Sequence, residues 1–158
     1  MKRFSKILAA MMALVLCVAM VSAAYAEGIN VVFIPKLSGN AFFESANVGA
    51  QDFAAKNGFT VTYDGNPEAS AANQVAIIQN AITNGADAIC ISTVDAAGVD
   101  DALKEAAAAG LTVTTWDSDA NPEHRSIMVS QGTPEQLGQM LVDMLAASLT
   151  ERGKDVNK

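Results

Sequence analysis

The chain has 158 residues and is acidic, with 17 Asp and Glu against 10 Lys and Arg and a net charge of −7. Such a surface does not attract phosphate backbones or anionic lipid, so the composition argues against nucleic acid and anionic membranes as partners. The apolar fraction of 51% is raised by a concentration of apolar residues near the N-terminus.

The first 26 residues have the three parts of a secretory signal peptide. A basic start (residues 2–6) precedes an almost unbroken apolar run (residues 7–21), and Ala24-Tyr25-Ala26 gives the small-x-small pattern that signal peptidase recognises. The run is short for a bilayer span, so a transmembrane anchor is a weaker interpretation. A lipoprotein anchor at Cys17 is also weaker, because Leu16 stands where a small residue is needed. We expect cleavage after Ala26 and a periplasmic protein.

Removal of residues 1–26 leaves 132 of the 158 residues, a length that suits one compact domain. The leader carries three basic and no acidic residues, so its loss takes the net charge from −7 to −10. Cys90 becomes the single cysteine, which excludes an internal disulfide. Because Cys90 lies in an apolar run, we expect a buried and unreactive thiol.

Strand and helix patterns alternate along the mature chain. Short apolar runs closed by Pro, Gly or Asn predict strands, and apolar residues spaced three and four apart predict helices. In the first helix, Phe42, Ala46 and Phe53 share the face that we expect to be buried. In chain order we expect a strand at 30–35, a helix at 41–57, a strand at 59–63, a helix at 69–84, a strand at 88–92, a helix at 97–109, strands at 111–116 and 126–130, and a final helix after Thr133.

This alternation predicts an α/β fold, a doubly wound parallel sheet with right-handed crossovers and helices on both faces. The final helix has Thr133 as its N-cap and Pro134 in its first turn. Its apolar stripe comprises Leu137, Met140, Leu141, Met144 and Leu145.

Ligands of open parallel sheets bind at the carboxyl ends of the strands. The residues there include an ammonium, carboxylates, amides, hydroxyls and two adjacent aromatic rings, a mixture that suits a small polyhydroxylated ligand. Taken singly, each has a plainer role, such as a solvated lysine, a turn-capping aspartate or a core phenylalanine. Their convergence on one edge favours a binding site. The set comprises Lys36, Ser38, Asn40, Phe42, Phe43, Thr93, Asp95, Asp117, Ser118, Asp119, Gln131 and Thr133.

Signatures of enzymes are missing. The sequence has no Gly-rich phosphate loop and no G-x-S-x-G elbow. Its one histidine, His124, is expected in solvent, without partners for a triad or a zinc site. Asp117 and Asp119 would share a face of an extended segment, as in a calcium or magnesium loop, but no third ligand follows at the spacing of such a loop. We expect no cofactor and no bound metal.

Four strings in this order resemble the type I periplasmic sugar-binding proteins, and most closely the autoinducer-2 binders of the Lsr uptake system and then the rhamnose binders. The resemblance extends from about residue 29 to 149. Its strings are Val32-Phe33-Ile34-Pro35-Lys36-Leu37-Ser38-Gly39-Asn40-Ala41-Phe42-Phe43, Thr62-Tyr63-Asp64-Gly65, Thr115-Trp116-Asp117-Ser118-Asp119 and Gln131-Gly132-Thr133-Pro134-Glu135-Gln136-Leu137-Gly138.

The resemblance implies the substrate-binding component of an ABC importer, a monomer when full length, which delivers its ligand to a permease. Two α/β lobes would close on autoinducer-2 or a related sugar. Lys36 and Asp117 match the polar contacts of the autoinducer-2 binders, while Phe42 and Phe43 match the aromatic wall of the wider group. Asn40 fits the sugar-binder pattern better than the autoinducer-2 pattern.

The family chain is about twice as long, so we expect residues 27–131 to form the N-terminal lobe and 132–158 to begin a truncated second lobe. Ser118 stands where ribose-type binders have arginine, which argues against ribose. The alternative function is a secreted α/β enzyme acting on a sugar or sugar phosphate. The sensor lobe of a transcription repressor has the same fold but is cytoplasmic, so the leader argues against it.

Overall fold

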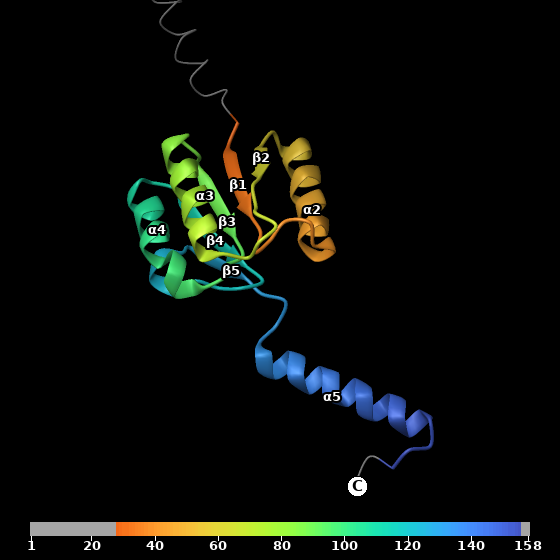
Figure 1. The fold of residues 1–158 in the computed structure, drawn as a ribbon. Helices are drawn as coiled ribbons and strands as arrows, with labels where there is room; N and C mark the ends of the chain where they lie inside the picture. Colours follow the sequence, from red (N-terminus) through yellow and green to blue (C-terminus); the bar gives the residue numbers. More distant parts are fainter. Residues whose placement is uncertain (1–27, 156–158) are drawn as a thin grey trace, which may run out of the picture.

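The computed structural model describes residues 28–155, and the expected signal peptide with its cleavage site lies outside that range. Five strands form one sheet in the order β2-β1-β3-β4-β5, and all neighbours run parallel, which confirms the predicted fold class (Figure 1). The order reverses between β1 and β3, because the chain first steps to one side of β1 and then to the other. The strands are β1 (Asn30–Ile34), β2 (Thr60–Tyr63), β3 (Ala88–Ile91), β4 (Thr112–Trp116) and β5 (Ile127–Val129).

Helix α2 lies on one side of the sheet, whereas α3 and α4 lie side by side on the other (Figure 1). A short 3₁₀ helix, η1, lies between β4 and β5, where the sequence predicts neither a helix nor a strand. No helix within residues 28–155 has both the length and the apolar character that a bilayer span requires. The helices are α2 (Ala41–Asn57), α3 (Ala71–Thr83), α4 (Ala96–Ala108), η1 (Pro122–His124) and α5 (Pro134–Glu151).

The hydrophobic core lies between the sheet and the α3–α4 layer. Alternate residues of β3, such as Ile89 and Ile91, point into it together with Val113 of β4. Ile78 of α3 and Leu103 of α4 belong to the same core cluster on the helix side, and neither is exposed to solvent. Burying each such side chain contributes about 1.5–3 kcal/mol, so this layer holds most of the stabilising contacts.

The prediction of the buried face of α2 is wrong, because the observed buried positions lie one residue further along the chain. Phe43 and Ala54 are buried, while Phe42 and Phe53 are 49% and 58% exposed. The reason is local packing, because Phe43 turns its edge to Trp116 and thereby sets the rotation of the helix. Phe53 instead packs beside the Phe59 ring, 5.8 Å away between centroids.

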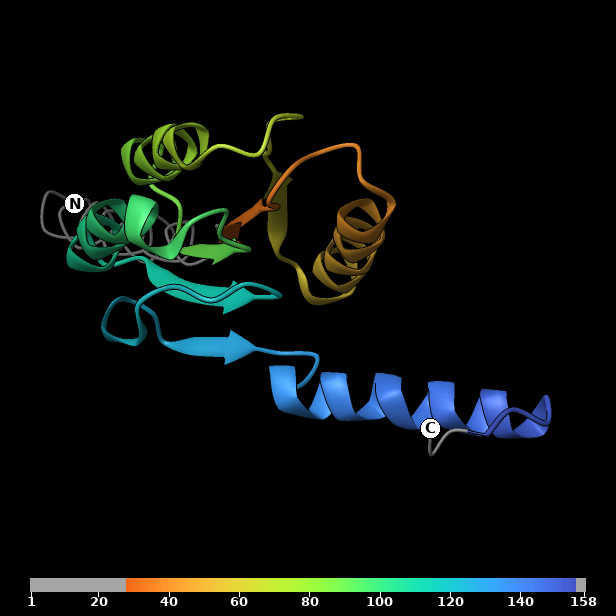
Figure 2. The same ribbon diagram turned by 60° about the horizontal axis from the view of Figure 1, so that its bottom comes forward.

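Helix α5 projects away from the sheet beyond β5 (Figure 2). Its start is built as predicted, with Thr133 and Gln136 forming a reciprocal capping box. Its predicted apolar stripe is exposed, and so is Val142. The elements from β1 to β5 therefore form the packed unit, and α5 contributes little to its stability.

Candidate functional site

Lys36 and Asp117 meet at the carboxyl edge of the sheet, where the strand order reverses. Lys36 follows β1 and Asp117 follows β4, and the Lys36 Nζ lies 3.3 Å from the Asp117 Oδ2. The same ammonium donates to the Ser118 hydroxyl. Both side chains stay partly accessible, at 31% and 22%. The pair therefore presents one positive and one negative group at the edge where ligands of such sheets bind.

The backbone at Asp117 is unusual. Its φ of 59° is the only positive value at a non-glycine position within residues 28–155. Aspartate tolerates this conformation better than most residues, although it still costs of order 1 kcal/mol. The turn follows β4 directly, since the Ser118 N–H donates back to the Trp116 carbonyl at 2.6 Å. It corrects the expectation that Asp117 and Asp119 share one face of an extended segment.

The Asp117 carboxylate has three further donors besides Lys36. Ser92 Oγ donates to Oδ2 at 2.8 Å, and Gln131 Nε2 donates to Oδ1 at 3.2 Å. The Ser118 hydroxyl is a longer contact at 3.5 Å. Partial burial by itself would raise the pKa of Asp117, but the hydrogen bonds from Ser92 and Gln131, with the Lys36 charge, outweigh it and hold the pKa below its usual value. The group is an anion at neutral pH.

An aromatic cluster borders this ion pair. The Trp116 ring stacks on Phe33 at 4.8 Å between centroids and on Phe42 at 6.2 Å. Phe43 contacts it edge-on at 5.6 Å and is buried. Phe42, by contrast, keeps half of its surface free and can cover the C–H face of a ligand.

A hollow of about 230 Å³ lies between α2 and the ends of β4 and β5. It joins the aromatic cluster to the Asp117 carboxylate on the side of the sheet that carries α2. A volume of this size is slightly below the usual range for small-molecule sites. Its lining residues are Phe42, Ala46, Trp116, Asp117, Val129, Ser130 and Gln131.

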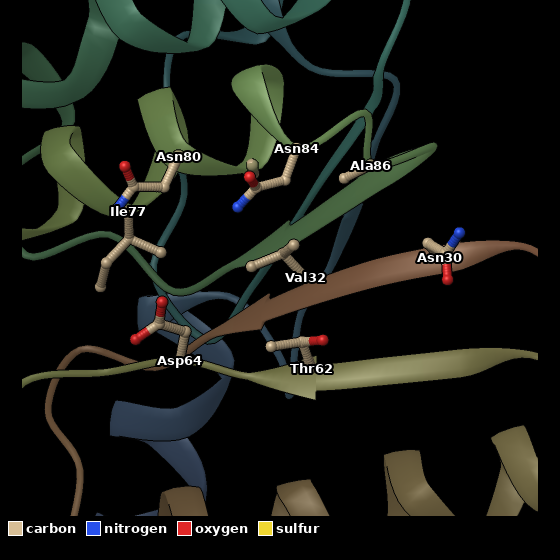
Figure 3. A pocket seen from close by; sticks show the side chains of 9 residues that line it. Asn30, Val32, Thr62, Asp64, Ile77, Asn80, Asn84 and Ala86 are labelled. Carbon is tan, nitrogen blue, oxygen red and sulfur yellow. The ribbon is translucent and has the colours of Figure 1, made fainter.

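A second hollow, of about 320 Å³, lies between α3 and the β1–β2 pair. Figure 3 shows Asn80 of α3 and the C-cap residue Asn84 facing Thr62 and Asp64 across it. It is larger than the first, but it contains no basic side chain and lies away from the Lys36–Asp117 pair. The first hollow therefore fits the predicted chemistry better.

Asn40 stands in this structure as the N-cap of α2. Its Oδ1 accepts a hydrogen bond from the Phe42 N–H at 2.9 Å, and the residue is exposed.

The site predicted from the sequence omitted Ser92 and Trp116, and it included Gln131 only as one residue of the sheet edge. Trp116 directly precedes Asp117 at a strand end, a position that could have identified it. Ser92 carried no comparable signal.

The β4–β5 loop has internal ion pairs. Arg125 binds Asp119 through two hydrogen bonds of 2.8 and 2.7 Å, and Thr115 Oγ1 donates to the same carboxylate at 2.6 Å. The Arg125 bonds lower the pKa of Asp119 to about 2 despite an opposing effect of partial burial. His124 was expected in solvent, but it is half-buried and contacts Asp100 of α4 at 2.7 Å. The His124–Asp100 contact therefore holds the loop against α4, and the Arg125–Asp119 pair closes the loop on itself.

The carboxylates of Asp117 and Asp119 are thus directed to different cations. No group of three or more potential metal-ligating side chains occurs within the part of the chain that the structure describes.

Cys90 was expected in the core, but it is only half-buried, because its side chain lies on the α2 side of the sheet. Its sulfur atom lies 3.0 Å from the Thr114 hydroxyl. Burial still raises the pKa of this thiol and disfavours the reactive thiolate.

An open parallel sheet with a charged and aromatic edge defines an α/β ligand-binding lobe. A family model for the periplasmic binding protein domain matches residues 31–157, and the chain belongs to this family. Proteins of this family work outside the cytoplasmic membrane, in the periplasm or the extracellular space.

Several solved structures of solute-binding proteins are similar to this chain. LsrB from Clostridium saccharobutylicum in complex with AI-2 is 65% identical, with a TM-score of 0.78, and the match covers 82% of this chain and 40% of that one. A solute-binding protein from Clostridium phytofermentas with bound L-rhamnose is 30% identical (TM-score 0.71; 75% and 37% covered). One from Burkholderia graminis in complex with D-arabinose is 32% identical (TM-score 0.71; 79% and 43% covered). The chain therefore spans about two fifths of the length of these relatives.

Proposed function

We propose that this chain is the N-terminal lobe of an ABC-importer substrate-binding protein that takes up autoinducer-2. The observation that carries the proposal is the Lys36–Asp117 pair beside the aromatic hollow, since it combines a donor and an acceptor for hydroxyl groups with a ring face for the C–H side of a sugar. The identity of 65% to LsrB in complex with AI-2 supports this ligand over L-rhamnose, whose complex is 30% identical.

In this proposal Lys36 donates to a ligand oxygen, and Asp117 accepts from a ligand hydroxyl. Phe42 and Phe43 form the aromatic wall, with Phe42 supplying the accessible face. Asn40 supports the site by starting α2 at this edge and adds a polar contact. Three of the solved structures at 30% identity or above are ABC transporter solute-binding proteins with bound sugars, which favours binding over the alternative of a secreted sugar enzyme.

Residues up to about 131 form one lobe in this proposal, and residues from 132 onward begin the second. The whole protein works as a monomer that closes on the ligand and delivers it to the permease. A lobe alone supplies only part of the ligand contacts, so the chain by itself binds weakly. Export is proposed to remove residues 1–26, and mass spectrometry of the secreted protein would show Glu27 as the first residue.

The binding experiment is an NMR titration of ¹⁵N-labelled chain with AI-2, L-rhamnose and D-ribose. We expect amide shifts around Lys36 and Asp117 with AI-2, smaller ones with L-rhamnose and none with D-ribose. Asp117→Asn should weaken AI-2 binding by about tenfold or more, since it removes the acceptor charge.

Asp119→Asn is the matched control for Asp117→Asn, because this neighbouring carboxylate binds Arg125 instead of facing the hollow. An equal loss in both variants, or shifts confined to another surface, would contradict the proposed site. Micromolar or tighter binding by this chain would contradict the view that the ligand needs both lobes.

A further inference from the structure

A buried glutamine of α3 lies directly beneath the proposed site. Gln74 is 3% exposed, and its carboxamide points toward the carboxyl ends of β1 and β3, where the strand order reverses. A side chain of this type is rarely so buried, and then only when its polar atoms have partners. The hydrogen-bond partners of the Gln74 carboxamide therefore indicate its structural role.

The Gln74 carboxamide hydrogen-bonds the two loops that leave these strands. Its Nε2 donates to the Pro35 carbonyl at 3.1 Å and to the Ser92 carbonyl at 2.8 Å. Its Oε1 accepts from the Val94 N–H at 2.9 Å. Both donors and the acceptor are thus used, and they satisfy three backbone groups that lie beyond the ends of the strands.

Two of these three backbone groups, those of Pro35 and Ser92, connect directly to the proposed site. Pro35 directly precedes Lys36. Ser92 has no exposed surface, and its hydroxyl donates to the Asp117 Oδ2 at 2.8 Å. One side chain of α3 therefore sets the distance between the loop that carries the ammonium and the loop that holds the carboxylate.

We infer that Gln74 is a positioning residue, which acts through Pro35 and Ser92 to hold Lys36 and Asp117 in a fixed geometry for the ligand. The inference rests on the proposed function for its meaning in binding, but the geometric coupling can be measured without ligand. An isosteric apolar residue would fill the same volume while leaving three backbone groups unpaired, and the loops would shift to satisfy them.

The first test is ligand-free and uses the pKa of Asp117, measured by ¹³C NMR of its carboxyl carbon. In Gln74→Leu, displacement of Ser92 should raise this pKa toward the ordinary 3.8. Ser92→Ala should raise it to a similar extent, and the double variant should add little, because both changes act through one hydrogen bond. An unchanged pKa in Gln74→Leu would overturn the inference whatever the outcome of the binding titration.

Ile78→Ala is the control for lost stability. Ile78 is buried one turn further along α3 and contacts neither loop through a side-chain hydrogen bond. It should lower Tm and leave the Asp117 pKa where it is in the wild type. If the Asp117 pKa rose equally in Ile78→Ala, Gln74 would be an ordinary core residue.

Gln74→Glu gives a test that does not depend on the leucine variant folding. A protonated glutamic acid can still donate to one carbonyl and accept from Val94, whereas its ionised form would face the Pro35 and Ser92 carbonyl oxygens. AI-2 binding, followed by amide shifts, should therefore be at least about tenfold weaker than in the wild type at pH 8 and recover toward pH 5. Gln79→Glu, exposed on the same helix, should show no such recovery.

Wild-type affinity separates the two proposals. Wild-type chain that binds no AI-2 at millimolar concentration would contradict the proposed ligand and leave the Asp117 pKa test intact. Wild-type binding combined with a Gln74→Glu variant that binds equally well at pH 8 would overturn the positioning role alone.

Discussion

The two faces of the sheet differ in how completely they are covered. On the α3–α4 side, Ile89, Ile91 and Val113 are buried almost completely. On the α2 side, the helix packs mainly on β2 and reaches β4 only through the contacts of its first turn with Trp116. Ile127 and Val129 of β5 remain 55% and 63% exposed. Stability is therefore concentrated on one side of the sheet, while the accessible aromatic and charged groups lie at the edge of the other.

The largest difference is expected between truncations to alanine on the two sides of the sheet. Leu103→Ala should lower the free energy of unfolding by about 3 kcal/mol, since it opens a cavity in the closed layer. Val129→Ala on the open face should change it by less than about 0.5 kcal/mol. Urea denaturation of both variants measures this, and similar losses would show that the α2 side is covered in solution.

The ion pairs of the β4–β5 loop should have an intermediate effect with a defined pH dependence. Asp119→Asn should cost about 1 kcal/mol at pH 7, a modest figure because the carboxylate is 36% exposed and solvent screens its pair with Arg125. The pKa of Asp119 falls from 3.8 unfolded to about 2 folded, so its contribution is complete above pH 3.8 and is lost as the pH falls toward 2.

Thermal unfolding at pH 7, 4 and 2 checks this dependence. The gap in Tm between wild type and Asp119→Asn should narrow below pH 3.8 and close near pH 2. Asp52→Asn, an exposed change on α2, is the control for loss of charge alone. A gap of constant size would contradict the depressed pKa.

Removal of the N-cap should affect global stability in the packed helix α2 but not in the unpacked helix α5. Asn40→Ala should lower global stability by about 1 kcal/mol, because α2 is part of the folded unit. Thr133→Ala removes a cap of similar strength from α5, yet it should reduce only the helix content seen by circular dichroism. Asn40→Asp keeps a capping oxygen and should restore stability, and a global loss in Thr133→Ala would place α5 within the folded unit.

The smallest effect is expected in the apolar stripe of α5. Leu141 is 69% exposed, so Leu141→Gln should change the free energy of unfolding by less than about 0.5 kcal/mol. Its exposed neighbours favour self-association at high concentration, and the substitution should reduce it. Sedimentation velocity of both proteins provides the measurement, and destabilisation above about 1 kcal/mol would show that the stripe is buried in solution.

Most elements of the fold could be predicted from sequence because their signals are local. The range predicted for the first helix coincides with α2, and the Thr133 cap is found where its pattern indicates. The edge that carries Lys36 and Asp117 followed from the rule for parallel sheets. Expectations failed where a neighbour from another element decides, as for Phe42 on α2 and for His124, whose partner Asp100 lies on α4.

By itself, the sequence determined the order of strands and helices, the parallel sheet and the types of charged residue at its carboxyl edge. Periodicity, turn residues and the handedness of crossovers specify these features, because each depends on a short stretch of chain. Only the tertiary structure decided how α2 is rotated, which donors surround Asp117, and that Gln74 joins the loops of β1 and β3. These features depend on contacts between residues as far as 81 positions apart, and no local pattern specifies such contacts.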